Sequence, residues 1–286
     1  MRRRTLLASS ATLLGAGLAG CLGDSGGGTT TAAPTTEATT EAPTTERTTD
    51  ATTYDASVSA SFERLQPNVV LLGIDSLGVR PKGHQYVFFR VDVTDGDPPE
   101  RAAFEFRFDG ERYPPGVDTG GMLWRDSEGD DRYTADRGDG WLVFELPETG
   151  DAGDAALVLG GDEWSVPEAV RERLEQPSPS LSLDWDVPEE QPAGESTLGF
   201  TVTNDTDRGT WFVGGVTGVG IRAAYAPVAG VVREVPAGET VSWEVTHDNG
   251  ADPGDDSVGD GEADGEYQLS WAQGDREQTV YLVAGE

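Results

Sequence analysis

Apolar and polar residues alternate with a period of two along most of the chain after residue 57, as in β-strands with one buried and one solvated face. In the first block the alternating or apolar segments are 69–74, 87–93, 104–108, 142–146 and 155–159. In the second block they are 181–187, 198–202, 211–213, 228–235, 241–245, 267–271 and 279–283. Clusters of Gly, Pro and Asp separate these segments, so the pattern predicts antiparallel sheets.

Helical periodicity is confined to one short segment, 167–174, where Val170 and Leu174 lie four residues apart behind Pro167. We expect this helix to lead into a domain boundary at the proline-containing run after Gln176. The glycines of 214–220 have the wrong spacing for a dinucleotide-binding loop and precede no helical pattern. They predict a flexible junction between strands.

About seven strands in roughly a hundred residues is the size expected of an immunoglobulin-like sandwich. The sequence therefore predicts an all-β fold, with two immunoglobulin-like antiparallel β-sandwiches over 57–176 and 177–286. Segments 83–93 (GHQYVFFRVDV), 140–147 (GWLVFELP) and 156–159 (ALVL) resemble strands of telokin-like, immunoglobulin-like surface domains of unknown function. Residues 236–241 (PAGETV) resemble the turn before a strand in adhesion-related surface modules. The resemblance implies a fold and supplies no catalytic residues.

The N-terminus has the order of a secretory signal: three arginines, an apolar run over 6–18, and small residues before Cys21. The run Leu-Ala-Gly-Cys resembles the lipobox of prokaryotic lipoproteins, which implies that 1–20 is a signal peptide and that Cys21 carries the lipid. Arg3 and Arg4, followed by Thr and two leucines, resemble a twin-arginine export signal. An ordinary secretion signal with three arginines is the alternative. Two lipid chains on one residue suffice for stable anchoring.

Residues 21–56 are predicted to form a lipid-anchored, disordered tether. Thirteen threonines lie between residues 25 and 53, with Ala, Pro, Gly and few residues to bury. Such a composition cannot offset the entropy of ordering the chain.

The net charge is −32, and Lys82 is the single lysine among 286 residues. This composition resembles that of proteins from extremely halophilic archaea, where salt screens the self-repulsion of an acidic surface. The sequence contains no basic patch, so we expect no nucleic-acid partner.

Two candidate sites follow from local patterns. Asp260, Glu262 and Asp264 place carboxylates at alternate positions before Gly265, like the front of a calcium loop, but Trp271 stands where the bidentate Glu is needed. Weak calcium binding is one interpretation, and a solvated hairpin tip is the other. Asn204 begins an N-glycosylation sequon after a predicted strand.

No nucleophile motif accompanies the two histidines, His84 and His247, so we expect no enzymatic activity. Apart from weak calcium binding, we expect no cofactor. The sequence predicts a lipid-anchored protein on the extracellular face of the cell membrane, with a role in binding, adhesion or envelope organisation. Its expected partners are the membrane, through Cys21, and an unknown surface protein or glycan. The alternative is a sugar-binding protein or an accessory to an extracellular carbohydrate-directed enzyme.

Overall fold

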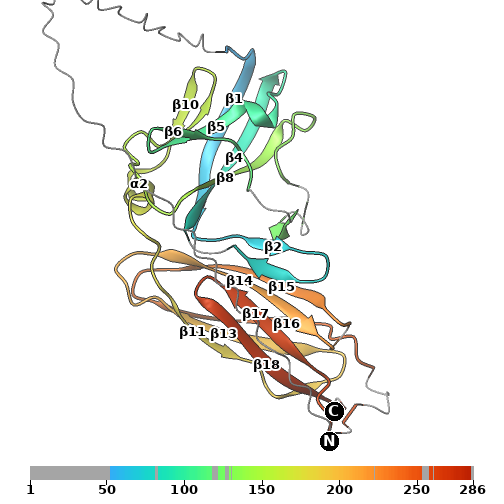
Figure 1. Cartoon of the computed structure of the whole chain (residues 1–286). Coiled ribbons are helices and arrows are strands. Elements are labelled where there is room, and N and C mark those ends of the chain that lie inside the picture. Colours follow the sequence, from blue (N-terminus) through green and yellow to red (C-terminus); the bar gives the residue numbers. More distant parts are fainter. Residues whose placement is uncertain are drawn as a thin grey trace, which may run out of the picture. The chain divides into compact units, whose positions relative to one another are not determined.

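A computed structural model describes residues 52–80, 83–117, 122–125, 129, 131–221, 223–252, 258–259 and 261–284. The predicted signal peptide, most of the predicted tether, the export residues Arg3 and Arg4, the lipidation residue Cys21 and the cation candidate Asp260 lie outside these residues. The described chain is predominantly β, with several sheets (Figure 1).

Ten strands precede residue 166: β1 (Ala56–Gln66), β2 (Val70–Leu72), β3 (Leu77–Val79), β4 (His84–Gly96), β5 (Phe104–Phe108), β6 (Glu111–Tyr113), β7 (Met122–Leu123), β8 (Asp139–Pro147), β9 (Ala156–Leu159) and β10 (Asp162–Ser165). They form three sheets, with strand orders β1-β4-β8, β10-β9-β5-β6 and β3-β2-β7. A short 3-10 helix, η1 (Arg101–Ala103), precedes β5.

The first two of these sheets share one apolar core. Phe89 of β4, Phe106 of β5 and Phe144 of β8 are almost completely buried, and their ring centroids lie 5.6 to 6.4 Å apart. Burying one such side chain contributes about 1.5–3 kcal/mol. The period-two pattern predicted these strands correctly, because their alternate residues fill this core.

Eight strands follow: β11 (Ser182–Asp186), β12 (Glu190–Pro192), β13 (Ser196–Thr203), β14 (Thr210–Val219), β15 (Ala226–Val235), β16 (Thr240–His247), β17 (Gly265–Trp271) and β18 (Gly274–Val283). The sheet orders are β11-β13-β16 and β12-β18-β17-β14-β15, and β12 pairs with β18 in parallel. An aromatic group joins the two sheets: Trp243 stacks on Phe200 at 5.2 Å and tilts against Phe212 at 5.5 Å.

The helix α2 (Glu168–Leu174) confirms the predicted helix, with Pro167 as its N-cap residue. Its two buried residues, Val170 and Leu174, belong to the first core. Among the described residues, no helix is long and apolar enough to cross a membrane.

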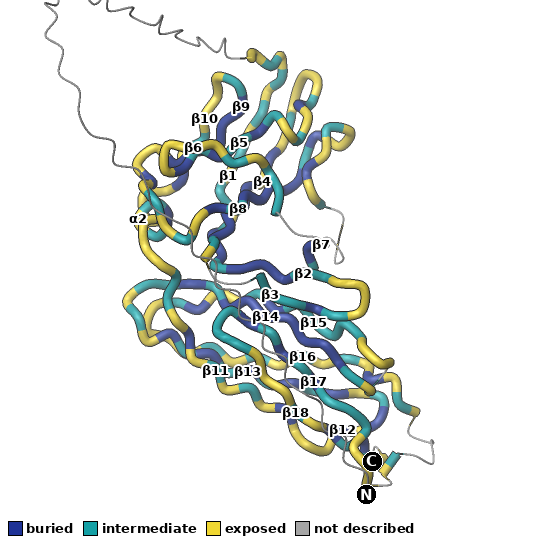
Figure 2. The backbone as a smooth tube through the Cα atoms, viewed as in Figure 1, coloured by how far each residue is buried: buried dark blue, intermediate teal, exposed yellow. Residues whose placement is uncertain are grey.

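The predicted flexible junction over 214–220 is wrong for most of that segment. Residues up to Val219 continue β14, which pairs with β15 and with β17. Glycine serves packing here: a Cβ on Gly214 would come within 3.1 Å of Leu269 Cδ1, and one on Gly215 within 2.9 Å of Leu77 Cβ. Figure 2 shows the resulting line of buried residues along β14.

The β2–β3 hairpin packs against β14, although the two elements are far apart in the sequence. Val70 and Leu77 form one apolar cluster with Val213, and partly buried Trp124, Trp211 and Val232 surround it. The absence of side chains at Gly215 permits this approach. The contact fixes the hairpin beside β15 and thereby forms one wall of the cavity described next.

Candidate functional site

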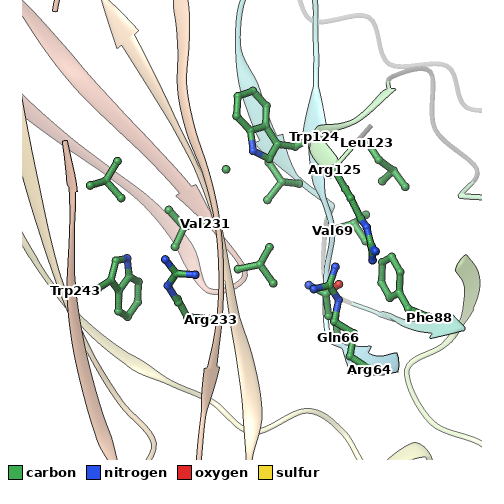
Figure 3. Close-up of a pocket in the computed structure, with 14 residues that line it drawn as sticks. Arg64, Gln66, Val69, Phe88, Leu123, Trp124, Arg125, Val231, Arg233 and Trp243 are labelled. Atoms are coloured by element: carbon green, nitrogen blue, oxygen red, sulfur yellow. The ribbon is translucent and has the colours of Figure 1, made fainter. Parts of the chain in front are cut away.

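A cavity of about 330 Å³ lies between residues of β1, β2, β4 and β7 and residues of β15 and β16. Figure 3 shows Arg64, Gln66, Phe88 and Arg125 gathered on one side, with Val231, Arg233 and Trp243 on the other. We call this site the arginine cavity, defined by Arg64, Arg125 and Arg233. Its volume is at the lower end of the range of about 300–1,000 Å³ that small-molecule sites occupy.

A β-bulge places Arg64 in the wall. Phe62 pairs with Phe89 and Arg64 pairs with Phe88, which leaves Glu63 as the extra residue of β1. Such a bulge re-aims the side chains that follow it. The Arg64 guanidinium carbon consequently lies 4.8 Å from the centre of the Phe88 ring and 5.6 Å from that of Trp211.

Arg125 is held in place by acids and by a ring. Its Nη1 and Nη2 donate hydrogen bonds to the two carboxylate oxygens of Glu63, at 2.7 and 3.3 Å. Its Nη2 lies 3.4 Å from Asp131 Oδ2, and its guanidinium carbon lies 4.7 Å above the Trp141 ring. Asp131 also accepts a hydrogen bond from the Trp141 indole, so this side of the cavity is pre-organised.

Arg233 stands apart from this network. It is exposed on β15, the last strand of its sheet, and has no ion-pair or hydrogen-bond partner for its side chain among the residues that the structure describes. By strand alternation it shares a face with buried Val231 and Val235. A charge at such a position on an edge strand also opposes pairing with another chain.

Gln66 brings a buried amide to the cavity. The residue is 2% exposed, but neither atom of its amide is among the buried side-chain atoms that lack a hydrogen-bond partner. The amide therefore adds a polar group to the wall without the cost of a buried unpaired one.

Two tryptophans complete the wall. Trp124 packs so closely on Gly230 that a Cβ at that position would overlap the indole ring. Trp243 is stacked on Phe200, which holds its ring rigid. The cavity therefore offers fixed aromatic and apolar surface beside cationic groups.

The chemistry of this arrangement favours an anion. Guanidinium groups bind carboxylate, sulfate or phosphate through paired hydrogen bonds. Glu63 and Asp131 offset much of the charge of Arg64 and Arg125, so Arg233 supplies the positive excess. Arg64 and Arg125 lie toward the face of β15 that packs on Trp124, whereas Arg233 lies on the other face of this strand, toward Trp243.

One residue of the predicted cation site, Asp264, makes a hydrogen bond within the fold. Asp264 Oδ2 accepts a hydrogen bond from the Leu282 backbone amide at 2.6 Å, while Asp260 lies outside the described residues. No cluster of three or more His, Cys, Asp or Glu that could hold a metal occurs within the described ranges. Calcium binding by Asp260, Glu262 and Asp264 stays a prediction.

Asn204 is fully buried at the turn between β13 and β14. Its amide nitrogen donates to the carbonyls of Arg208, Val235 and Pro236, and its Oδ1 accepts from the Thr206 amide and hydroxyl. This geometry argues against the glycosylation prediction, because the nitrogen that would carry the glycan is already bonded inside the fold.

The two histidines make polar contacts with different residues. His84 Nε2 is 3.5 Å from Glu145 Oε1, and His247 Nε2 is 2.8 Å from the Tyr267 hydroxyl. Neither histidine lines the arginine cavity.

The sequence patterns did not predict the arginine cavity. Its residues come from segments around 64–70, 88, 123–125, 230–233 and 243–245, which no motif connects. One local signal existed: Arg233 interrupts an apolar run at a position that alternation assigns to the core.

No family model matches this chain, and no curated protein matches it. A solved structure of a β-glucosidase from Listeria innocua, in complex with gluconolactone, matches with 13% sequence identity and a TM-score of 0.28. The match covers 60% of this chain and 22% of that one.

Proposed function

We propose that this chain is a non-enzymatic, lipid-anchored binding protein on the extracellular face of the cell membrane of a high-salt organism. In this proposal Cys21 carries the lipid, a twin-arginine signal with Arg3 and Arg4 directs export, and residues up to 56 form the tether. The two sheet pairs are immunoglobulin-like modules over 57–176 and 177–286. The strand number and the mostly antiparallel pairing support that finer description.

The observation on which the proposal depends is the arginine cavity. A surface protein that only spaces or shields the membrane has no need of a cavity of about 330 Å³ in which arginines are held against aromatic rings.

The sugar-binding alternative gains support from the same site. Its rigid aromatic side chains, Phe88, Trp124 and Trp243, lie beside hydrogen-bonding groups. Ligand sites commonly combine apolar walls with a few placed polar groups.

Site-specific crosslinking in cells tests the binding function. Cys21 is the single native cysteine, so a second cysteine can be labelled selectively with a benzophenone maleimide once Cys21 is lipidated. Val245→Cys places the label in the cavity, and Ser242→Cys places it on the same strand facing away. After irradiation at native salinity, we expect an adduct at residue 245 that is absent at residue 242. Equal adducts at both positions, or none at 245, contradict the proposal.

A further inference from the structure

We infer that an extended acidic segment of a partner protein binds in the arginine cavity by pairing with the outer edge of β15. This inference rests on the proposed binding function and names the kind of partner. Three features carry it: a strand edge that lines the cavity, a cavity that reaches both faces of this strand, and an arginine without an acidic partner among the described residues.

The edge of β15 lines the cavity. This strand is the last of its sheet, so it pairs with β14 on one side only. Residues 230–233 all border the cavity, although successive side chains of a strand point to opposite faces. A cavity that touches four consecutive residues therefore runs along the edge of the strand.

The backbone of this edge is available for pairing. The register between β14 and β15 is regular over 230–233, and the ladder uses alternate backbone groups of β15. The remaining N–H and C=O groups point away from β14. Outside the ladder, no backbone hydrogen bond joins 230–233 to another residue that the structure describes. Such an edge is a template for one more strand.

The cavity has room for part of that strand. Paired strands lie about 4.8 Å apart, rise about 3.3 Å per residue and occupy a layer about 10 Å thick. By these dimensions, the cavity volume of about 330 Å³ corresponds to roughly two residues of an extended chain. We expect the bound segment to continue along the edge beyond the cavity.

The two faces of β15 offer different surroundings to an added strand. Val231 and Arg233 lie on the face toward Trp243, whereas Gly230 packs on Trp124 on the other face. The side chains of an added strand alternate between the same two faces. A segment in which acidic and apolar residues alternate therefore places carboxylates beside Arg233 and apolar side chains against Trp124.

The acidic character of the segment follows from Arg233. No described residue pairs with its guanidinium, in a chain that has 20 cationic residues against 52 acidic ones. An exposed charge of this kind opposes pairing with a neutral or cationic strand. A carboxylate on the added strand instead forms charge-assisted hydrogen bonds with the guanidinium. Arg233 therefore selects acidic segments over other extended chains.

Calorimetric titration of the full-length chain in molar KCl tests this inference. The probe is the capped peptide Thr-Val-Glu-Val-Glu-Val-Thr, and the control peptide has Lys in place of both Glu residues. We expect the acidic peptide to bind at least tenfold more tightly than the basic one. Equal binding of the two peptides, or no binding of the acidic one, overturns the inference.

Backbone methylation tests the strand pairing itself. The N–H groups of alternate residues in an extended chain point to opposite sides. One variant of the acidic peptide is N-methylated at both Glu residues, and another at two of the Val residues. We expect one variant to lose at least tenfold in affinity and the other to lose much less. Equal affinities of the two variants contradict pairing with β15.

Two matched substitutions locate the binding. Arg233 and Arg276 are both exposed on strands of the same sheet, and Arg276 does not border the cavity. Arg233→Glu should weaken the acidic peptide at least tenfold and strengthen the basic one. Arg276→Glu should leave both affinities unchanged. Equal effects of the two substitutions overturn the assignment of the peptide to this cavity.

Hydrogen exchange identifies the strand that pairs. With the acidic peptide bound, amides of 230–233 that face the cavity should exchange at least tenfold more slowly. The strands β11 and β16 are also the last of their sheet and should not change. Protection of either strand in place of β15 overturns the inference.

The outcomes separate this inference from the proposed function. If the acidic peptide does not bind while residue 245 still forms its specific crosslink, the partner class is wrong and the binding function stands. A glycan attached to the label at residue 245 leads to the same conclusion. A dimer of the chain alone that covers the β15 amides makes a second copy the occupant and overturns the acidic partner.

Discussion

The backbone amide of Leu77 donates a hydrogen bond of 2.9 Å to the hydroxyl oxygen of Thr217, 140 residues further along the chain. Both residues are buried, so the bond is shielded from water. It joins the β2–β3 hairpin to β14 beside Gly215, and so supports the wall of the arginine cavity.

Replacing this hydroxyl should destabilise the fold. Thr217→Val keeps the shape of the side chain but leaves the Leu77 amide buried without an acceptor. We expect the free energy of unfolding to fall by roughly 1–3 kcal/mol, measured by urea titration in molar KCl. Thr246→Val, at an exposed position on β16, is the control and should change it by less than about 0.5 kcal/mol. A loss of equal size in the two variants would show that the Leu77 bond contributes nothing.

The amide of Gln191 should stabilise the fold, because it is buried and bonds to Pro188 and Thr197. Gln191→Met removes these hydrogen bonds and should lower the free energy of unfolding by roughly 1–3 kcal/mol. Gln66→Met is the matched control, because Gln66 is equally buried and its amide is not among the buried atoms that lack a partner, and it should change the free energy by less than about 0.5 kcal/mol. Equal losses in the two variants would show that the Gln191 hydrogen bonds contribute nothing.

Alkaline pH should weaken the fold through Tyr133. Burial raises the pKa of Tyr133 to about 12 from its ordinary value of 10.0, and the Glu100 carboxylate adds to this shift. The buried hydroxyl donates a hydrogen bond to the Pro99 carbonyl at 2.8 Å. Between pH 10 and about 12 the unfolded chain releases a proton that the folded chain retains, so stability falls as pH rises.

Tyr133→Phe tests this dependence. The variant should be less stable at pH 8, because it lacks the hydrogen bond. Its free energy of unfolding should also fall less steeply above pH 10, by up to about 1.4 kcal/mol per pH unit. Tyr225→Phe, at an exposed tyrosine, should leave the slope unchanged. Parallel pH profiles for the parent and Tyr133→Phe would refute the assignment.

Membrane attachment should depend on the single cysteine. Cys21→Ser removes the sulfur that the proposed lipid requires, so the variant should appear in the medium and the parent in the membrane fraction. Fractionation of cells grown at high salinity and probed with an antibody measures this. A Cys21→Ser chain that still sediments with membranes would show that another segment anchors the protein.

The strands that the sequence predicted best are those whose alternate residues are large. In β16, aromatic and branched residues alternate with charged or hydroxyl neighbours along the whole strand, whereas β4 and β8 contain runs of large residues that are buried on both faces. The strand β1 was missed altogether, because Ser57, Ala60 and Ser61 contribute little contrast between its two faces. The glycines of β14 do not show the alternation that is typical of a strand. They occupy positions where Leu77 and Leu269 of other elements pack closely against the backbone.

The arginine cavity could not be predicted from the sequence for a different reason. Arg64 faces the cavity because of the bulge at Glu63, and Arg125 because Glu63 and Asp131 hold it. Both causes are contacts between residues distant in sequence. Only Arg233 is recognisable from the local sequence, because it interrupts the alternation of apolar residues in β15.

Crosslinking from residue 245 decides whether the arginine cavity is the binding site. A benzophenone label on Val245→Cys lies in the cavity, whereas a label on Ser242→Cys faces away from it on the same strand. At native salinity we expect an adduct at residue 245 that is absent at residue 242. Equal adducts at both positions, or none at residue 245, would show that the protein binds its partner elsewhere.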